Sequence, residues 1–129
     1  MNAAAAASPV RIGVVGATGL VGTEMLRILE ERSFPIAELR AYASPRSEGR
    51  KLPFAGGEVS CQVLRPGCFD GLDLVVVDVD DPLAVEWVPE AVVAGARVVD
   101  NSAAFRMDPD VPLVVAEVNP EDLTDLPKG

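Results

Sequence analysis

The stretch VVGATGLVG, residues 14–22, carries three glycines at intervals of three directly after an apolar run. The run that leads into it, residues 11–15, is rich in β-branched side chains, which is typical of a strand buried on both faces of a parallel sheet. From Thr18 to about Arg32 the apolar residues change to helical spacing. The glycines therefore lie where a first strand gives way to a first helix.

The same alternation continues along the rest of the chain. Pro89 lies inside the second helical stretch, so a kink or a break is expected there. The further elements are expected as strands at residues 38–44, at 51–64 (two short strands around Gly56-Gly57), at 72–79, at 96–102 and at 112–119, and as a helix at residues 82–95. This alternation predicts an α/β fold with a doubly wound, mostly parallel sheet.

Length and charge narrow the class of protein. The 129 residues suffice for one core, so residues 10–129 are expected to form one domain and residues 1–9 a disordered tail. The net charge of −9 argues against nucleic acid, whose phosphates require a basic surface. The sequence has no signal-peptide pattern and no run of roughly 20 apolar residues. We therefore expect no membrane contact and a cytoplasmic protein.

The cysteine and histidine content argues against a disulfide framework and a metal site. The sequence contains two cysteines, Cys61 and Cys68, and no histidine. Histidine and clustered cysteines supply the ligands of most transition-metal sites, so no metal is expected.

The glycine loop is the strongest functional signal in the sequence. Gly16, Gly19 and Gly22 would permit a tight turn, close approach of a pyrophosphate, and close packing of the helix on the strand. The phosphates would lie against the unpaired amides at the start of the helix, where the helix dipole favours anions. A turn that needs small residues and binds nothing remains the alternative.

The residues after the second strand indicate which dinucleotide would bind. In folds that bind NAD, a carboxylate near the end of the second strand holds the ribose 2′-hydroxyl. Here the strand is followed by Ser44, Pro45, Arg46 and Ser47, with no carboxylate. A guanidinium flanked by two hydroxyls suits a 2′-phosphate, which favours NADP over NAD. A solvated polar loop is the other interpretation.

Three motifs in order resemble one enzyme family. They are GATGLVG at residues 16–22, SPRSEGR at 44–50 and DNSAAFRMDPDVPLVVAEVNPEDL at 100–123. Together they resemble the N-terminal half of bacterial aspartate-β-semialdehyde dehydrogenases, from about Val10 to the last residue. The resemblance implies the reversible conversion of aspartyl-β-phosphate to aspartate-β-semialdehyde with NADPH, in amino-acid biosynthesis, by dimers or tetramers.

The resemblance also implies roles for individual residues. The loop with Gly16 would line the pyrophosphate and Asn101 would lie near the cofactor. Arg106 would receive the substrate phosphate, although a surface salt bridge to Asp108 or Asp110 is its other interpretation. The remaining cofactor-binding positions would be Thr18, Gly19, Leu20 and Val21 at the pyrophosphate, and Ser44, Arg46 and Ser47 at the 2′-phosphate.

The sequence departs from the family in its catalytic groups. The chain ends at DLPKG, where the family continues to a catalytic cysteine, and the family's general-base histidine lies further on. Cys61 and Cys68 precede the LDLVVV strand and are not expected to replace that cysteine. Acyl transfer through a thioester requires that cysteine as the nucleophile, so the chain alone is expected to have no catalytic activity.

A second departure lies in the loop after LDLVVV. The family has small residues (FSAGGS) there, beside the nicotinamide half of the cofactor, whereas this chain has VDVDDP. Asp78, Asp80 and Asp81 would then lie at the edge of the cofactor crevice and repel a pyrophosphate, so NADP binding is expected to be weak or lost. The family's proline near the end is Ala116 here.

Three interpretations therefore remain open. The first is an NADP-binding domain, either a fragment or one part of a split enzyme. The second is a stand-alone, non-catalytic binding or interaction module. The third is a repurposed activity in which Asp78, Asp80, Asp81 or Glu117 acts as acid or base. In each case the apolar face that the other half would cover is expected to be covered by self-association or by a partner chain.

Overall fold

The computed structural model describes residues 8–124. Six strands form one sheet in the order β3-β4-β2-β1-β5-β6. The strands are β1 (Val10–Val15), β2 (Ile36–Tyr42), β3 (Lys51–Phe54), β4 (Gly57–Gln62), β5 (Leu74–Val77) and β6 (Arg97–Asp100). The helices are α1 (Leu20–Glu31) and α2 (Asp81–Val93), with the short 3-10 helices η1 (Pro45–Ser47) and η2 (Pro120–Thr124). Apart from Ser8 and Pro9, the predicted tail lies outside the described residues.

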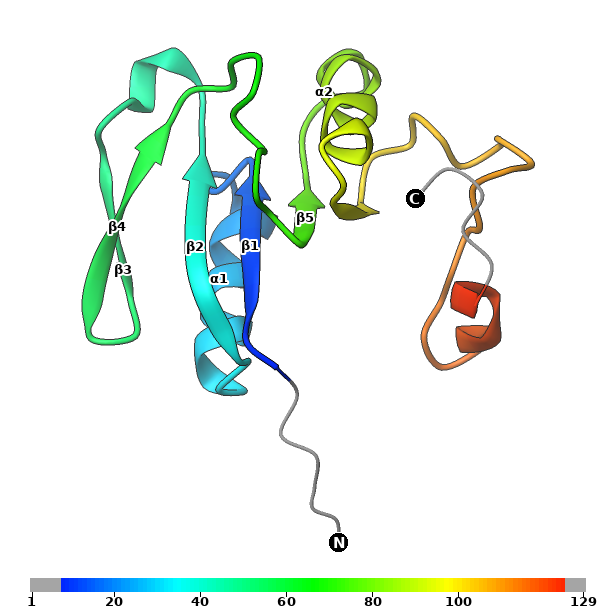
Figure 1. Cartoon of the computed structure of the whole chain (residues 1–129), viewed down its shortest axis with the longest axis horizontal. Coiled ribbons are helices and arrows are strands. Elements are labelled where there is room, and N and C mark those ends of the chain that lie inside the picture. The colour runs from blue at the N-terminus through cyan, green and yellow to red at the C-terminus, as the bar shows by residue number, and fades with distance from the viewer. Residues whose placement is uncertain (1–7, 125–129) are drawn as a thin grey trace, which may run out of the picture.

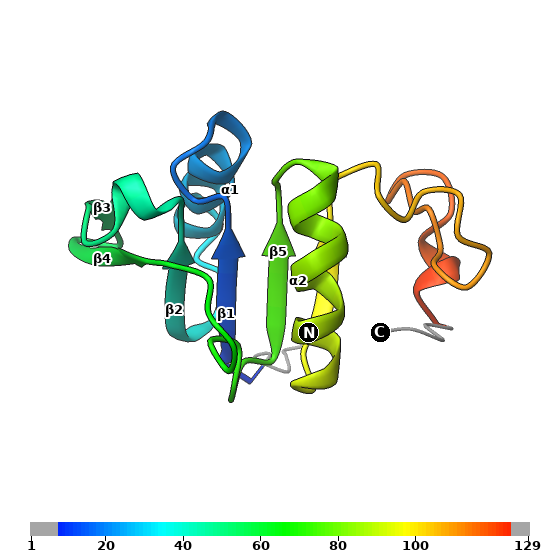
Figure 2. The same ribbon diagram turned by 90° about the horizontal axis from the view of Figure 1, so that it is seen from above.

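The pairing of the strands confirms the predicted doubly wound, mostly parallel sheet. β1 pairs in parallel with β2 on one side and with β5 on the other, β2 pairs in parallel with β4, and β5 with β6. Only the hairpin between β3 and β4 is antiparallel among the described strands. Figures 1 and 2 show α1 beside β1 and β2, and α2 beside β5.

Each helix covers its own face of the sheet. Successive residues of a strand point to opposite faces, so Val14 and Val15 of β1 belong to different cores. Val14 packs with Leu26 and Leu29 of α1, whereas Val15 packs in the other core with Val88 of α2. Burial of residues 12–15 of β1 accounts for the apolar, largely β-branched character of that stretch.

The two helices differ from their predicted bounds in small ways. α1 begins at Leu20 with Gly19 as its N-cap, two residues after the predicted start at Thr18. α2 runs unbroken from Asp81 to Val93 with Pro89 inside it, so of the kink or break expected at Pro89 the break does not occur. The carbonyl that loses its partner to Pro89 belongs to Val85, which is exposed and can bind water instead.

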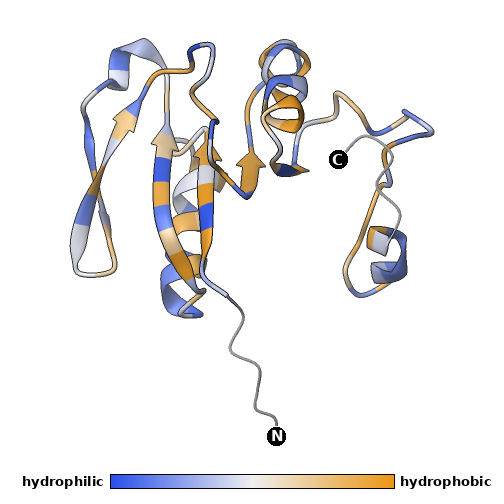
Figure 3. Cartoon of the chain, viewed as in Figure 1, coloured by the Kyte–Doolittle hydropathy of each residue, from blue (hydrophilic) through white to orange (hydrophobic). Residues whose placement is uncertain are grey.

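The two strands expected around Gly56-Gly57 form a hairpin, whereas the strand expected at residues 112–119 does not form. β3 and β4 flank Ala55 and Gly56, whose φ angles of 51° and 80° fit the two-residue turns that close hairpins. By contrast, residues 112–119, predicted as a strand, pair with no described strand. Figure 3 shows that this stretch is largely hydrophobic, and Figures 1 and 3 show it away from the sheet.

Local hydrogen bonds explain why residues 112–119 form no strand. The Asn119 side chain accepts a hydrogen bond from the Val115 amide at 2.8 Å and donates one to the Leu113 carbonyl at 2.9 Å. The Val118 amide donates to the Val115 carbonyl at 2.8 Å. These bonds satisfy backbone groups that would otherwise join a sheet ladder, so a turn replaces the strand.

Candidate functional site

The glycine loop lies at the carboxyl edge of the sheet, between β1 and α1. Gly16 has a φ of +87°, and a Cβ there would lie 2.1 Å from the backbone oxygen of Asp78. A Cβ on Gly22 would lie 2.0 Å from the carbonyl oxygen of Gly16. Both glycines are therefore required by contacts within the protein, which place the loop directly against the end of β5.

Gly19 is different, because nothing within residues 8–124 crowds it. Its φ of −76° suits any residue, and among the described residues a Cβ there would have only the Gly16 oxygen near it, at 3.4 Å. Gly19 is the N-cap of α1 and no described side chain caps the helix; its first turn also contains no acidic residue. The first amides of α1, at Leu20, Val21 and Gly22, have no partner inside the helix. This uncapped helix start fits an anionic group.

The structure brings the predicted pyrophosphate residues together in this loop. Thr18 is half-buried, while Leu20 and Val21 are exposed on the first turn of α1. Large apolar side chains exposed beside bare amides form a surface for a ligand that has both apolar and anionic parts.

The predicted 2′-phosphate residues lie at the end of β2, in and before η1. Ser44 is the N-cap of η1, and its carbonyl accepts a hydrogen bond from the Ser47 amide at 2.8 Å. Arg46 is exposed and forms no ion pair within residues 8–124. The nearby carboxylate of Glu48 is bound by Arg65 at 2.8 Å instead. The Arg46 guanidinium is thus available to an anion.

On the other side of β1, the ends of β5 and β6 are joined by side chains. Nδ2 of Asn101 donates a hydrogen bond to Oδ1 of Asp78 at 3.0 Å. The Arg106 guanidinium in turn donates to the Asn101 carbonyl at 3.2 Å. Asn101 and Arg106, separated in sequence, therefore belong to one hydrogen-bonded group at the carboxyl edge of the sheet.

The acidic candidates do not gather at one point. Asp81 accepts a hydrogen bond from the Ala103 amide at 3.0 Å, and Asp80 is the exposed N-cap residue of α2. Glu117 is exposed in the C-terminal segment, residues 101–124, and lines neither cavity described below. Of the four carboxylates, Asp78 alone lines the crevice beside the glycine loop.

This crevice is a cavity of about 300 Å³, which we call the crevice cavity. It lies between the first turns of α1, the ends of β1, β5 and β6, and the C-terminal segment. Its polar lining residues are Asp78, Asp100, Asn101 and Arg106, and its apolar ones include Val21, Met25 and Leu113.

Asp100 is a residue of this crevice that sequence reasoning did not single out. Its Oδ1 accepts a hydrogen bond from the Ser102 amide at 2.8 Å, and its Oδ2 accepts one from the Ser102 hydroxyl at 2.9 Å. The sequence signal was present, because an aspartate two residues before a serine at the end of a strand favours such a turn.

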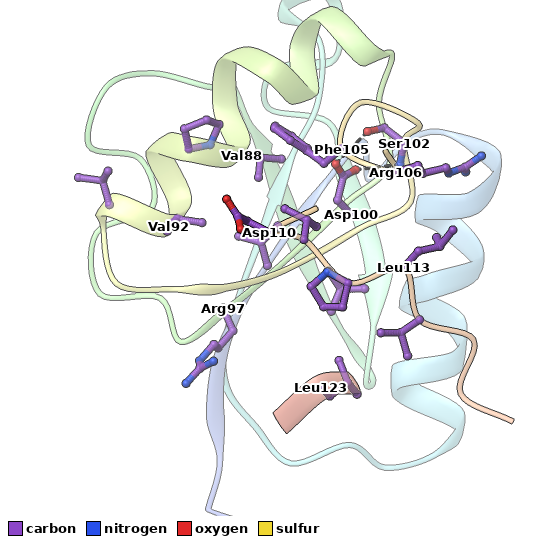
Figure 4. A pocket seen from close by; sticks show the side chains of 17 residues that line it. Val88, Val92, Arg97, Asp100, Ser102, Phe105, Arg106, Asp110, Leu113 and Leu123 are labelled. Atoms are coloured by element: carbon purple, nitrogen blue, oxygen red, sulfur yellow. Dashed lines mark hydrogen bonds between the residues drawn. The ribbon is translucent and has the colours of Figure 1, made fainter. Parts of the chain in front are cut away.

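A larger cavity of about 550 Å³, the edge cavity, lies beside β6 at the edge of the sheet. Figure 4 shows Val88 and Val92 of α2 around it together with Leu113 and Leu123 of the C-terminal segment. Some of its apolar lining residues are exposed, among them Val93 and Val99. The described residues contain no helix long and apolar enough to cross a membrane.

Strand order, glycine loop and uncapped helix together define a dinucleotide-binding α/β domain. The family model for the NAD-binding domain of semialdehyde dehydrogenases matches residues 11–126, and the chain belongs to this family.

Named relatives agree with this assignment. The chain is 50% identical over 114 residues to an aspartate-semialdehyde dehydrogenase from Synechocystis. This match covers 88% of this chain and 34% of that enzyme. The crystal structure of aspartate semialdehyde dehydrogenase II from Vibrio cholerae superposes with a TM-score of 0.87 at 40% identity, over 91% of this chain and 35% of the other. The chain thus spans about a third of the length of these relatives.

A third relative has been solved with a cofactor. The aspartate semialdehyde dehydrogenase from Candida albicans, crystallised with NADP, superposes with a TM-score of 0.74 at 32% identity. The match covers 91% of this chain and 36% of that one.

Proposed function

We propose that this chain binds NADP and forms the cofactor-binding part of an aspartate-semialdehyde dehydrogenase. The observation that carries the proposal is Gly19, which precedes the uncapped amides of α1 and which no described residue crowds. Contacts within the protein explain Gly16 and Gly22, but they do not explain why position 19 has no side chain. Close approach of a pyrophosphate does explain it.

The preference for NADP over NAD rests on the end of β2. Arg46 lies there between Ser44 and Ser47 and forms no ion pair with any described residue, and the carboxylate of Glu48 is bound by Arg65. A guanidinium can bind a phosphate through two hydrogen bonds, whereas it gains less from a neutral 2′-hydroxyl. The NADP reported with the Candida albicans relative is consistent with this preference.

The cofactor would supply hydride transfer, and the chain would bind and orient it. The glycine loop would hold the pyrophosphate, and Arg46 the 2′-phosphate. Asn101 and Arg106 lie on the side of the glycine loop opposite Arg46, and the Arg106 guanidinium donates a hydrogen bond to the Asn101 carbonyl. By its resemblance to the family, Arg106 would receive the phosphate of the substrate. A guanidinium can bind such a group by donating two hydrogen bonds to it.

Titration calorimetry with NADP and NAD tests this function. In Arg46→Ala, affinity for NADP should fall about ten- to a hundredfold, as expected for lost hydrogen bonds to a charged group, while affinity for NAD changes little. Arg32→Ala is the matched control, because Arg32 lies at the other end of α1. Equal affinity of the wild-type chain for NADP and NAD would contradict the 2′-phosphate assignment.

The edge cavity supports the expectation that a further polypeptide covers this face. Val93 is 86% exposed, Val99 55% and Leu113 60%, and all three lie around the same cavity. Contiguous exposed apolar side chains usually mark an interface. Light scattering over a range of concentrations distinguishes self-association from a monomer that requires a different chain.

A further inference from the structure

The strand order assigns the two halves of a bound dinucleotide to opposite sides of β1. The glycine loop follows β1, and Arg46 follows β2 on one side of it. Asp78 and Asn101 follow β5 and β6 on the other side. A dinucleotide crosses the loop at its pyrophosphate. With its 2′-phosphate at Arg46, its nicotinamide half would extend toward Asp78 and Asn101.

Asp78 lies in this half of the crevice, with its carboxylate hydrogen-bonded to the Asn101 side chain. Asp78 lines the crevice cavity together with Val21 and Gly22 from the first turn of α1. Its amide donates to the Val15 carbonyl at 3.0 Å, which fixes it at the end of β5. Its carboxylate receives a hydrogen bond from the neutral amide of Asn101, and no ion pair within residues 8–124 involves it. Its negative charge is therefore not neutralised by a direct partner.

The two redox states of the cofactor differ in charge where this carboxylate lies. The nicotinamide ring is a cation in the oxidised form and neutral in the reduced form, while the phosphates are the same in both. A carboxylate beside the ring attracts the cation, and it repels the phosphates of both forms equally. The repulsion cancels when the two affinities are compared, so their ratio reports on the ring alone.

We propose that Asp78, held by Asn101, sets the relative affinity of the crevice for the two redox states and favours the oxidised cofactor. The inference rests on the proposed function, because it requires a nicotinamide dinucleotide in the crevice. Arg106 and Asp100 line the same cavity, but their charges are the same in wild type and in a variant at position 78. They do not contribute to a difference between the two proteins.

The test measures dissociation constants for NADP⁺ and NADPH by calorimetry in the wild-type chain and in Asp78→Asn. An asparagine at 78 still accepts the hydrogen bond from Asn101 but carries no charge. The ratio of the NADPH to the NADP⁺ dissociation constant should fall about three- to tenfold. The change should be larger at low salt, where screening is weaker. Glu86→Gln, which removes one charge from an exposed position of α2 outside both cavities, should leave the ratio unchanged.

The outcomes separate this inference from the proposed function. Binding of neither cofactor by the wild-type chain would overturn both. Binding of both, with the same ratio in wild type and Asp78→Asn, would overturn the role of Asp78 and leave the proposed function intact. If Asp78→Asn does not fold, Asp78→Ser carries the same measurement, since serine also removes the charge.

Discussion

The carbonyl oxygen of Gly16 occupies the space that a side chain at Gly22 would need: a Cβ at position 22 would approach it to 2.0 Å. The atom in the way is backbone, at the start of the helix, and cannot rotate aside. Gly22→Ala should therefore lower the free energy of unfolding by about 1–3 kcal/mol or more, as overpacking does in cores. Urea denaturation followed by circular dichroism measures it; unchanged stability would contradict the close packing of α1 on the loop.

Gly19→Ala should leave the stability of the fold nearly unchanged and weaken the binding of NADP. A methyl group at position 19 meets only an ordinary contact at 3.4 Å, and the φ of −76° suits alanine, so stability should change by less than about 1 kcal/mol. Affinity for NADP should nevertheless fall about tenfold or more, because the methyl group enters the space before the helix amides. Unaltered affinity in a folded variant would identify the loop as a turn without a binding role.

The main features of the fold could be predicted from the sequence because local pattern and tertiary position agree there. β1 is rich in β-branched residues and β5 is a continuous apolar run, and residues 12–15 and 75–77 of these strands are buried. The glycines mark the first strand-to-helix junction, where Gly16 and Gly22 meet backbone atoms. The stretch 112–119 has the same composition as a strand, but its pattern could not reveal that Asn119 would bind its backbone first.

The site could be predicted only where neighbouring strands determine it. The loops after β1 and β2 adjoin because those strands pair, so the glycine loop and Arg46 could be expected on the same edge. The environments of Asp78, Asp80 and Asp81, in the loop after β5, were harder to predict because each of these side chains has different neighbours. Asp78 faces Asn101, Asp81 binds the Ala103 amide and Asp80 is exposed. Spacing in sequence does not determine which donor each carboxylate meets.

Tyr42 provides a spectroscopic test of the core on the α2 side. Its side chain is fully buried, and its hydroxyl donates to the Cys68 carbonyl. Burial raises the pKa of Tyr42 to about 12, partly opposed by the nearby Arg40 guanidinium. Because the folded value is raised, this contribution to stability is complete below about pH 10 and is lost as pH rises through about 12.

Tyr42 is the only tyrosine of the sequence, so phenolate absorbance reports on it alone. At about pH 11 the folded chain should show little phenolate, whereas the chain in denaturant should be largely ionised. An identical titration in the folded and denatured chain would contradict the burial of the hydroxyl.

Acid stability should depend in part on Asp73, at the start of β5. Its carboxylate accepts hydrogen bonds from the Arg11 side chain, at 3.3 Å, and from the Arg11 amide, at 2.8 Å. These bonds, with that of the side chain the larger cause, lower the pKa of Asp73. A lowered folded value means that the stabilisation is present above the ordinary aspartate pKa and is lost as pH falls below it. In Asp73→Asn the melting temperature should therefore drop less between about pH 6 and about pH 2.5 than in wild type. Equal drops would show that the pair does not contribute.

The chain of 129 residues should not catalyse the reduction of NADP with aspartate semialdehyde and phosphate. Acyl transfer requires an activated nucleophile and a base, and the sequence contains no histidine and two cysteines. Cys61 is buried in the core on the α1 side, and burial raises the pKa of its thiol. Burial also raises the pKa of the Cys68 thiol, which is half-buried and packs against the core on the α2 side. Both thiols therefore favour the protonated, weakly nucleophilic form at neutral pH.

Nicotinamide absorbance measures turnover, with the full-length enzyme of a relative as positive control. Turnover that persists in Cys61→Ser and Cys68→Ser would point to contaminating host enzyme, whereas turnover lost in one of them would overturn the prediction.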